Sequence, residues 1–205
     1  MNIPKAQDLL EKFKNTSNLK DYGEIVECNS FWERHLIIGD IDSDVGDAIE
    51  NMIRFWNRLD DENNIPVEKR RPIKIYIDSN GGDLCATFTM IDAIRLSKTP
   101  VWTINIGTAY SGGFFTFIAG HKRFAYPHST FLYHEGSTGQ ISDAGKFRNF
   151  AKFYDQQLAK LKELTLEYTN ISSELYETKK NDDWWFDTKE AIELGVVDEI
   201  AEGFI

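Results

Sequence analysis

The chain of 205 residues is long enough for one α/β domain, and its 41% hydrophobic and 27% charged residues are typical of a soluble globular protein. Its formal net charge of −10 argues against a nucleic-acid partner, because phosphate binding needs basic stripes and the dense basic cluster is confined to Lys69-Arg70-Arg71. No apolar run approaches the roughly 18 residues that a membrane span requires, so no membrane association is expected.

The amino terminus and the cysteines indicate a reducing compartment. Residues 1–14 mix charged and apolar side chains and lack the uninterrupted apolar run of a secretory signal. Cys28 and Cys85 are too few and too scattered for a disulfide framework or a metal knuckle. We therefore expect a cytoplasmic protein with neither a metal site nor a cofactor.

The first 30 residues are expected to precede the main domain, which spans residues 31–205. Apolar side chains recur at helical spacing over residues 4–15, which predicts a short amphipathic helix. Such a helix is marginal on its own, so it should dock on the body or on a neighbour. Residues 16–30 are polar and weakly patterned, which favours an irregular lead-in.

Strand and helix signals alternate over the next part of the chain. Short apolar runs predict strands, and apolar residues every three or four positions predict helices. This alternation implies a mainly parallel sheet with right-handed βαβ units. The expected strands are Leu36–Gly39, Ile73–Ile77 and Val101–Ile106, the expected helices are 45–59, 84–94 and 114–119, and a charged loop covers 60–72.

The carboxyl-terminal part adds one further strand and two helices. Phe131–Tyr133 is an apolar run that delivers His134 at its end. Residues 142–170 read as a helix of about 40 Å, at 1.5 Å per residue, which exceeds the body of such a domain. It should protrude or pack on another subunit. Asp187 begins the last helix with a pattern like a capping box, and Gly195 ends it.

The carboxyl ends of three expected strands carry residues suited to acyl chemistry. In parallel sheets, ligands gather at this edge. Ser111 lies just beyond one strand and before an apolar helix, a corner that exposes a hydroxyl beside free backbone N–H groups. The N–H groups of Gly82 and Gly112 could hold an oxyanion. The nucleophile-elbow pattern G-x-S-x-G is absent, however, and serine is also a favoured N-cap, so the corner alone fits plain capping as well.

A serine nucleophile needs a base that takes its proton, and the base needs a carboxylate that orients it. Of the four histidines, His134 is best placed, at the end of a strand, although a histidine there could also bond to backbone at a sheet edge. Asp182 and Asp183 precede three aromatic residues, 184–186, whose bulk could bury one carboxylate and so orient the imidazole. A solvated turn is the alternative for this pair.

Taken together, these segments resemble the proteolytic subunit of Clp protease, the ClpP family. The blocks follow the family's order with near-family spacing between residues 33 and 200, and five blocks in register are a specific signal. They are Ile75–Gly82, Ile106–Gly113, Lys122–Ser129, Tyr133-His134, and the closing segment with Asp183-x-x-Phe186 and Glu190–Asp198.

The resemblance implies a ClpP/crotonase-type α/β fold and a serine endopeptidase with a Ser-His-Asp triad. By position, Ser111 matches the nucleophile, His134 the base and Asp183 the acid. Gly82 and Gly112 match the oxyanion-hole donors. A peptide substrate would bind as an extended strand along Gly82–Leu84, with Asp83 and Leu84 in contact.

The family also implies an assembly and a partner. Its members form rings of seven subunits, stacked in pairs, and receive protein substrates from an unfoldase that hydrolyses ATP. Residues 135–170 match the handle through which the rings meet.

The chain departs from the family at several positions: Asn80 replaces a proline, Gly112 a methionine, and Asp182 an arginine that couples ring contact to the active site. Two other functions remain open, a catalytically silent ClpP-like structural or adaptor subunit and a crotonase-fold acyl-CoA enzyme.

Overall fold

The computed structural model describes residues 11–12, 14 and 22–205. The helix expected over residues 4–15 therefore lies largely outside the described residues. The irregular lead-in expected over 16–30 is wrong from Tyr22 onward, where helix α2 (Tyr22–Glu33) begins. Its stabilisation is tertiary, because Phe31 is buried against the rings of Phe55 and Trp56, and a weakly patterned sequence does not reveal such contacts.

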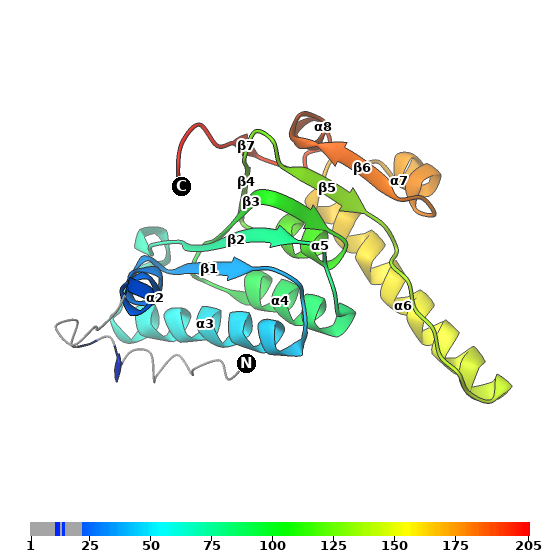
Figure 1. Cartoon of the computed structure of the whole chain (residues 1–205), viewed down its shortest axis with the longest axis horizontal. Helices are drawn as coiled ribbons and strands as arrows, with labels where there is room; N and C mark the ends of the chain where they lie inside the picture. Colours follow the sequence, from blue (N-terminus) through cyan, green and yellow to red (C-terminus); the bar gives the residue numbers. More distant parts are fainter. Residues whose placement is uncertain (1–10, 13, 15–21) are drawn as a thin grey trace.

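Within the described residues, seven strands form one sheet (Figure 1). The main path runs β1-β2-β3-β4-β7 and every pair along it is parallel, as the alternating pattern predicts. β5 continues the parallel pairing along the end of β3, and β6 pairs with β5 antiparallel. The strands are β1 (His35–Ile38), β2 (Ile73–Ser79), β3 (Val101–Tyr110), β4 (Lys122–Ala125), β5 (Thr130–Tyr133), β6 (Trp184–Asp187) and β7 (Glu199–Ile200).

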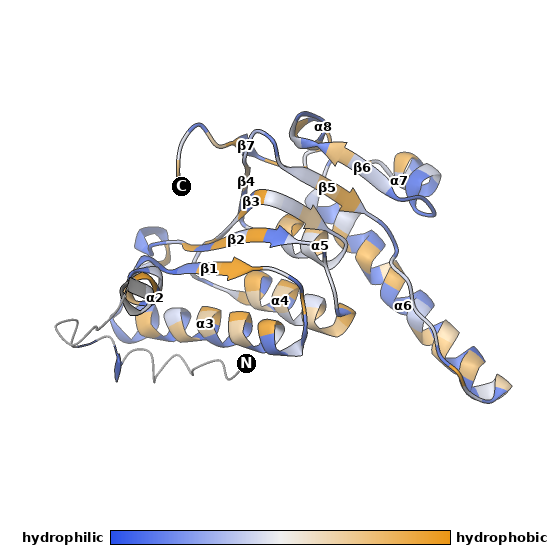
Figure 2. Ribbon diagram, in the orientation of Figure 1, coloured by the Kyte–Doolittle hydropathy of each residue, from blue (hydrophilic) through white to orange (hydrophobic). Residues whose placement is uncertain are grey.

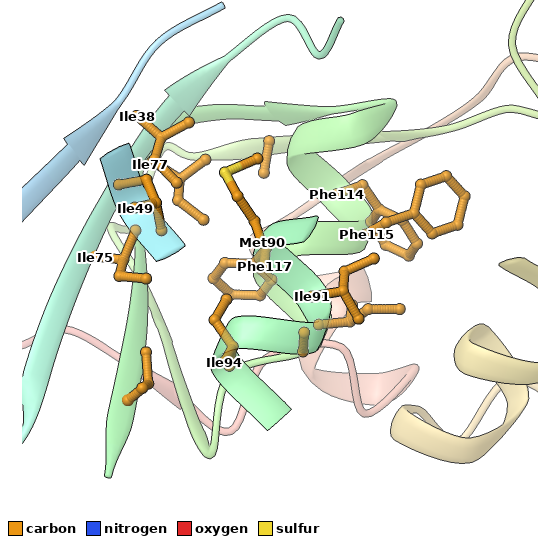
Figure 3. Close-up of a cluster of buried hydrophobic side chains, with 14 of the residues drawn as sticks. Ile38, Ile49, Ile75, Ile77, Met90, Ile91, Ile94, Phe114, Phe115 and Phe117 are labelled. Atoms are coloured by element: carbon orange, nitrogen blue, oxygen red, sulfur yellow. The ribbon is translucent and has the colours of Figure 1, made fainter. Parts of the chain in front are cut away.

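Three helices cover one face of this sheet and form the core with it. They are α3 (Ser43–Glu62), α4 (Leu84–Leu96) and α5 (Gly112–Ile118), and each agrees with an expected helix to within a few residues. Figure 3 shows isoleucines of β1 and β2 facing Met90 and Ile94 of α4 and Phe117 of α5. These side chains are almost fully buried. α5 is buried along its whole length, as its apolar sequence predicts.

Several short elements were not expected from the sequence. No strand is expected at β4, half of whose residues are basic, and β6 and helix α7 (Ser173–Lys179) give no clear periodic signal. α3 continues into the expected loop, which also contains a 3-10 turn, η2 (Val67–Lys69). β3 runs through Gly107 to Tyr110, past the glycine at which the strand was expected to end.

The long helix is α6 (Ala144–Tyr168), which extends away from the body at one corner (Figures 1 and 2). Its carboxyl-terminal half packs on the domain through buried Leu161 and Thr165. Towards the free end, Phe147 and Phe153 are about half exposed. The expected protruding helix is thus confirmed. The final helix is α8 (Thr188–Glu193), where the Asp187 carboxylate accepts hydrogen bonds from two backbone N–H groups, as its capping pattern predicts.

None of the helices in the described part of the chain combines the length and apolar character needed to cross a bilayer.

Candidate active site

Ser111 occupies a strained corner between β3 and α5. Its backbone has φ 52° and ψ −120°, a region that residues other than glycine rarely adopt. The conformation is fixed from both sides, because the Ser111 N–H donates to the Leu132 carbonyl (2.9 Å) and its carbonyl accepts from the Phe115 N–H (3.2 Å). Such a strand–turn–helix corner projects the side chain above the sheet edge.

The hydroxyl of Ser111 does not cap the helix that follows it. Ser111 stands at the N-cap position of α5, yet its side chain makes no capping hydrogen bond. Capping serines such as Ser172 use the hydroxyl to accept a backbone N–H at the start of the helix. The plain capping interpretation of the corner is therefore not supported, and the hydroxyl is available for chemistry.

The turn formed by Gly81 and Gly82 packs directly against this corner. Both glycines have positive φ, 96° and 149°. A Cβ atom on Gly81 would lie 2.7 Å from the Ser111 Cβ and 2.9 Å from the Gly112 nitrogen, a contact that only glycine permits. The turn that follows β2 and the corner that follows β3 are therefore in contact through their backbones.

Two backbone N–H groups at this contact have no hydrogen-bond acceptor in the part of the chain that the structure describes. Ile41 bridges the turn by donating its N–H to the Gly81 carbonyl and accepting from the Asp83 N–H, both at 2.8 Å. Within the described residues, this arrangement leaves the Gly82 N–H unused. Gly112 is the first residue of α5, so its N–H lacks an intrahelical acceptor as well. A Cβ atom on Gly112 would lie 3.5 Å from the Gly82 nitrogen, so the two donors are neighbours.

His134 follows β5 directly, and its Nδ1 atom lies 3.5 Å from an Asp183 carboxylate oxygen. This distance is at the outer limit of a hydrogen bond. The Asp183 side chain is 64% exposed, so of the two interpretations of the acidic pair, the solvated turn agrees with the structure and burial by the aromatic residues 184–186 does not. The reason is strand alternation in β6, which turns Trp184 and Phe186 into the core.

Most of the expected site residues line one pocket of about 430 Å³. Ser111, His134, Gly82 and Gly112 all line it, whereas Asp183 does not and approaches His134 from outside. Asp83 and Leu84 also line the pocket, although the Asp83 carboxylate serves mainly to cap α4 through the Ala86 N–H (2.8 Å). The remaining lining residues are Asn80, Thr87, Phe115, Glu135, Gly136, Ser137, Thr138, Tyr154 and Leu161.

Part of this lining was not recognised from the sequence as functional. Tyr154 and Leu161 both belong to α6. The Tyr154 hydroxyl donates a hydrogen bond to the Glu135 carbonyl (3.0 Å), and this bond connects the segment after His134 to the helix. Burial raises the pKa of the Glu135 carboxyl above its usual value. The seven-residue spacing of Tyr154 and Leu161 places them on one helix face, but nothing in the sequence indicates that this face borders a pocket.

Among the described residues, no three or more histidine, cysteine, aspartate or glutamate side chains lie together as metal ligands would. The chemistry available in the pocket is that of a hydroxyl, an imidazole with a nearby carboxylate, and two free N–H groups.

Comparison with known proteins relates most of the chain to one family. The family model described as Clp protease matches residues 40–203. The chain is 30% identical over 184 residues to the ATP-dependent Clp protease proteolytic subunit 2 of Treponema pallidum, which covers 88% of each protein. It is 28% identical over 196 residues to the protein of the same name from Treponema denticola, covering 95% of this chain and 86% of the relative. A third relative of that name, from Corynebacterium diphtheriae, is 33% identical over 134 residues, or 64% of this chain and 67% of its own length.

Proposed function

The chain belongs to the Clp protease family, and we propose that it is a serine endopeptidase that cleaves unfolded proteins or peptides through an acyl-enzyme. The observation that carries this proposal is the contact between the strained Ser111 corner and the Gly81-Gly82 turn, in a pocket that His134 also lines. A strained serine with an uncommitted hydroxyl beside two free N–H groups fits nucleophilic attack on a carbonyl.

In the proposed mechanism, the Ser111 Oγ attacks the scissile carbonyl while the His134 Nε2 takes its proton. The Nδ1 atom faces Asp183, so Nε2 is the nitrogen left for the serine. The carboxylate holds the proton on Nδ1 and stabilises the imidazolium that forms. The imidazolium then donates its proton to the leaving amine, and a water molecule repeats the sequence to release the acyl group.

The N–H groups of Gly82 and Gly112 would hold the negative oxygen of the tetrahedral intermediate. Donors of this kind act mainly on charge that develops in the transition state, and the loss of one typically costs about 10²–10³ in kcat. The substrate backbone would extend along Gly82–Leu84, where Asp83 and Leu84 line the pocket. In this proposal, the 3.5 Å contact between His134 and Asp183 shortens when substrate binds.

The proposal includes an assembly and a partner. The chain would form a homo-oligomeric ring, a heptamer or two stacked heptamers, and would accept substrates from an ATP-dependent unfoldase. The relatives carry "ATP-dependent" and "proteolytic subunit" in their names, which supports this arrangement. The protruding part of α6 offers Phe147 and Phe153 to a second copy. Native mass measurement and a pull-down with an unfoldase test these two parts separately.

The nucleophile is tested with a fluorophosphonate probe and a fluorogenic peptide. The parent protein should label at Ser111 and hydrolyse the peptide, and Ser111→Ala should lose both while its assembly is unchanged. Ser173→Ala, a substitution at an exposed serine of α7, should behave as the parent does. Parent-level hydrolysis by Ser111→Ala would show that another group is the nucleophile.

A catalytically silent ring subunit is the second candidate. It is favoured by the long distance between His134 and Asp183 and by the exposure of the carboxylate. A silent subunit would assemble normally but would not label or turn over, so the same experiment separates the two candidates.

A further inference from the structure

The two strands that lead to the proposed oxyanion donors change register just before the site. β2 and β3 pair in one register up to Ile77 and Asn105, and the next pair is Ser79 with Ala109. Between these pairs β2 contributes one residue, Asp78, whereas β3 contributes the segment 106–108. β3 therefore bulges by two residues immediately before its corner.

This bulge decides which residue lies beside the glycine turn. The register of Ser79 with Ala109, continued by two residues, brings Ser111 level with Gly81. Without the bulge, Ala109 would be level with Gly81 and Ser111 would lie two residues, about 6.6 Å, further along. The close approach of Gly81 to the Ser111 Cβ and the Gly112 nitrogen agrees with the shifted register.

Side chains, rather than the strand ladder, accept the N–H groups of Gly107 and Thr108 in the bulge. One carboxylate oxygen of Asp78 accepts the Thr108 N–H at 2.9 Å and the Thr108 hydroxyl at 3.0 Å. The Asn105 side-chain carbonyl accepts the Gly107 N–H at 3.0 Å. Gly107 leaves room for the carboxylate, since a Cβ atom there would lie 2.5 Å from the same Asp78 oxygen.

We propose that Asp78 is a positioning residue of the peptidase, whose carboxylate holds the β3 bulge and thereby keeps the Gly82 and Gly112 N–H groups converged on the substrate carbonyl. This inference rests on the proposed function. Asp78 is exposed and does not line the pocket, so it acts through Thr108 and the corner rather than on the substrate. Both of its hydrogen bonds end on one oxygen, so the position requires an acceptor and not a negative charge.

The test compares Asp78→Ala, which removes the acceptor, with Asp78→Asn, which keeps one of the same size. We expect Asp78→Ala to lower kcat on a fluorogenic peptide by at least about tenfold with KM within about twofold, because misplaced donors weaken transition-state binding. Asp78→Asn should stay within about threefold of the parent. Thr108→Val removes only the hydroxyl contact, and its kcat should lie between those of the two Asp78 variants. It also tests the inference if Asp78→Ala does not fold. Asp92→Ala, at an exposed aspartate of α4, is the matched control and should leave kcat unchanged.

A peptide aldehyde separates positioning from general destabilisation. Its hemiacetal oxygen occupies the oxyanion position, so its inhibition constant should weaken in Asp78→Ala by the same factor as kcat/KM falls. Parent-level kcat in Asp78→Ala, equal losses in the alanine and asparagine variants, or a loss confined to KM would each overturn the inference while the proposed function stands. A parent protein that neither hydrolyses the peptide nor labels at Ser111 would overturn both.

Discussion

Gly82 packs so closely on the backbone of Ile41 that a Cβ atom at position 82 would overlap the Ile41 carbonyl oxygen. Its φ of 149° is also unfavourable for any L side chain. Gly82→Ala must therefore displace the turn that carries a proposed oxyanion donor. We expect a loss of about 10²-fold in kcat and a destabilisation of about 1–3 kcal/mol, measured by peptide hydrolysis and by chemical denaturation.

Gly39→Ala is the control for this substitution. Gly39 precedes the same bridge, but a Cβ atom there would meet nothing within 4 Å, and its backbone is not in the positive-φ region. The variant should retain parent activity and stability. Normal kcat in Gly82→Ala would show that the turn can move without affecting the chemistry, and would remove Gly82 from the proposed mechanism.

The neighbouring acids Asp182 and Asp183 provide a matched pair for testing the orienting carboxylate. Both are exposed, yet within the described residues only Asp183 lies within ion-pair distance of the His134 imidazole. Asp183→Asn should lower kcat by about 10²–10⁴-fold, because the amide no longer stabilises the imidazolium and permits the wrong tautomer. The rate of fluorophosphonate labelling at Ser111 should fall in parallel.

Asp182→Asn should leave the chemical step near the parent rate when variants of equal assembly mass are compared. Similar losses in both asparagine variants would point to a general electrostatic effect of the acidic pair. A larger loss in Asp182→Asn would assign the orienting role to Asp182.

The strain at Ser111 predicts a conflict between stability and activity. A non-glycine residue at φ 52° and ψ −120° costs of the order of 1–3 kcal/mol, and glycine adopts such angles freely. Ser111→Gly should therefore unfold at a higher temperature than Ser111→Ala, by an amount that corresponds to about 1 kcal/mol, although neither variant hydrolyses peptides. Calorimetry on the two inactive variants isolates the backbone effect from any loss of the hydroxyl. Equal unfolding temperatures would mean that the corner is not strained.

The sequence predicted the elements with strong periodicity and missed those that depend on context. β1, β2 and helices α3 to α6 have clear apolar patterns, whether short or long, and their positions agree with the prediction to within a few residues. β4 is only four residues long, Lys122–Ala125, and two of them are basic, so its strand character comes from pairing with β3. β3 continues past Gly107 because its end pairs with β5, while Asp78 and Asn105 accept the N–H groups of Thr108 and Gly107, and no local propensity encodes these contacts.

The sequence predicted those site residues that directly follow strands. Ser111 and His134 both follow strands of one parallel sheet, and β3 pairs with β5, so their meeting at one edge follows from topology. The approach of Asp183 and the contribution of Tyr154 depend on how β6 and α6 dock, which involves contacts between distant residues. The sequence left the exposure of Asp183 open between a solvated turn and burial by the aromatic residues, because the pairing of β6 decides which of these side chains face inward.

Asp60 lies at the centre of a buried polar network whose contribution should depend on pH. Its carboxylate is fully buried and accepts hydrogen bonds from Arg34 at 2.5 and 2.7 Å and from the Thr99 hydroxyl at 2.8 Å. Burial by itself would raise the pKa of Asp60, but these hydrogen bonds and the charges of Arg34 and Arg70 outweigh it and hold the pKa below its ordinary value. The ionised form is therefore the one that the fold stabilises.

The sign of the pH effect follows from this depressed pKa. The contribution of Asp60 should be fully present above the ordinary carboxyl pKa of 3.8 and should be lost as the pH falls through the lower folded-state value. Asp60→Asn leaves the largely buried Arg34 side chain, 11% exposed, without its counter-charge and should cost about 3 kcal/mol at pH 7. Below about pH 4, the difference between parent and variant should shrink, because the carboxyl of the unfolded parent then binds protons that the folded form takes up only at lower pH. Denaturant titrations from pH 7 to pH 3, with Asp92→Asn as the exposed control, measure this difference, and a gap that stays constant or widens with acid would contradict the role assigned to the Asp60 charge.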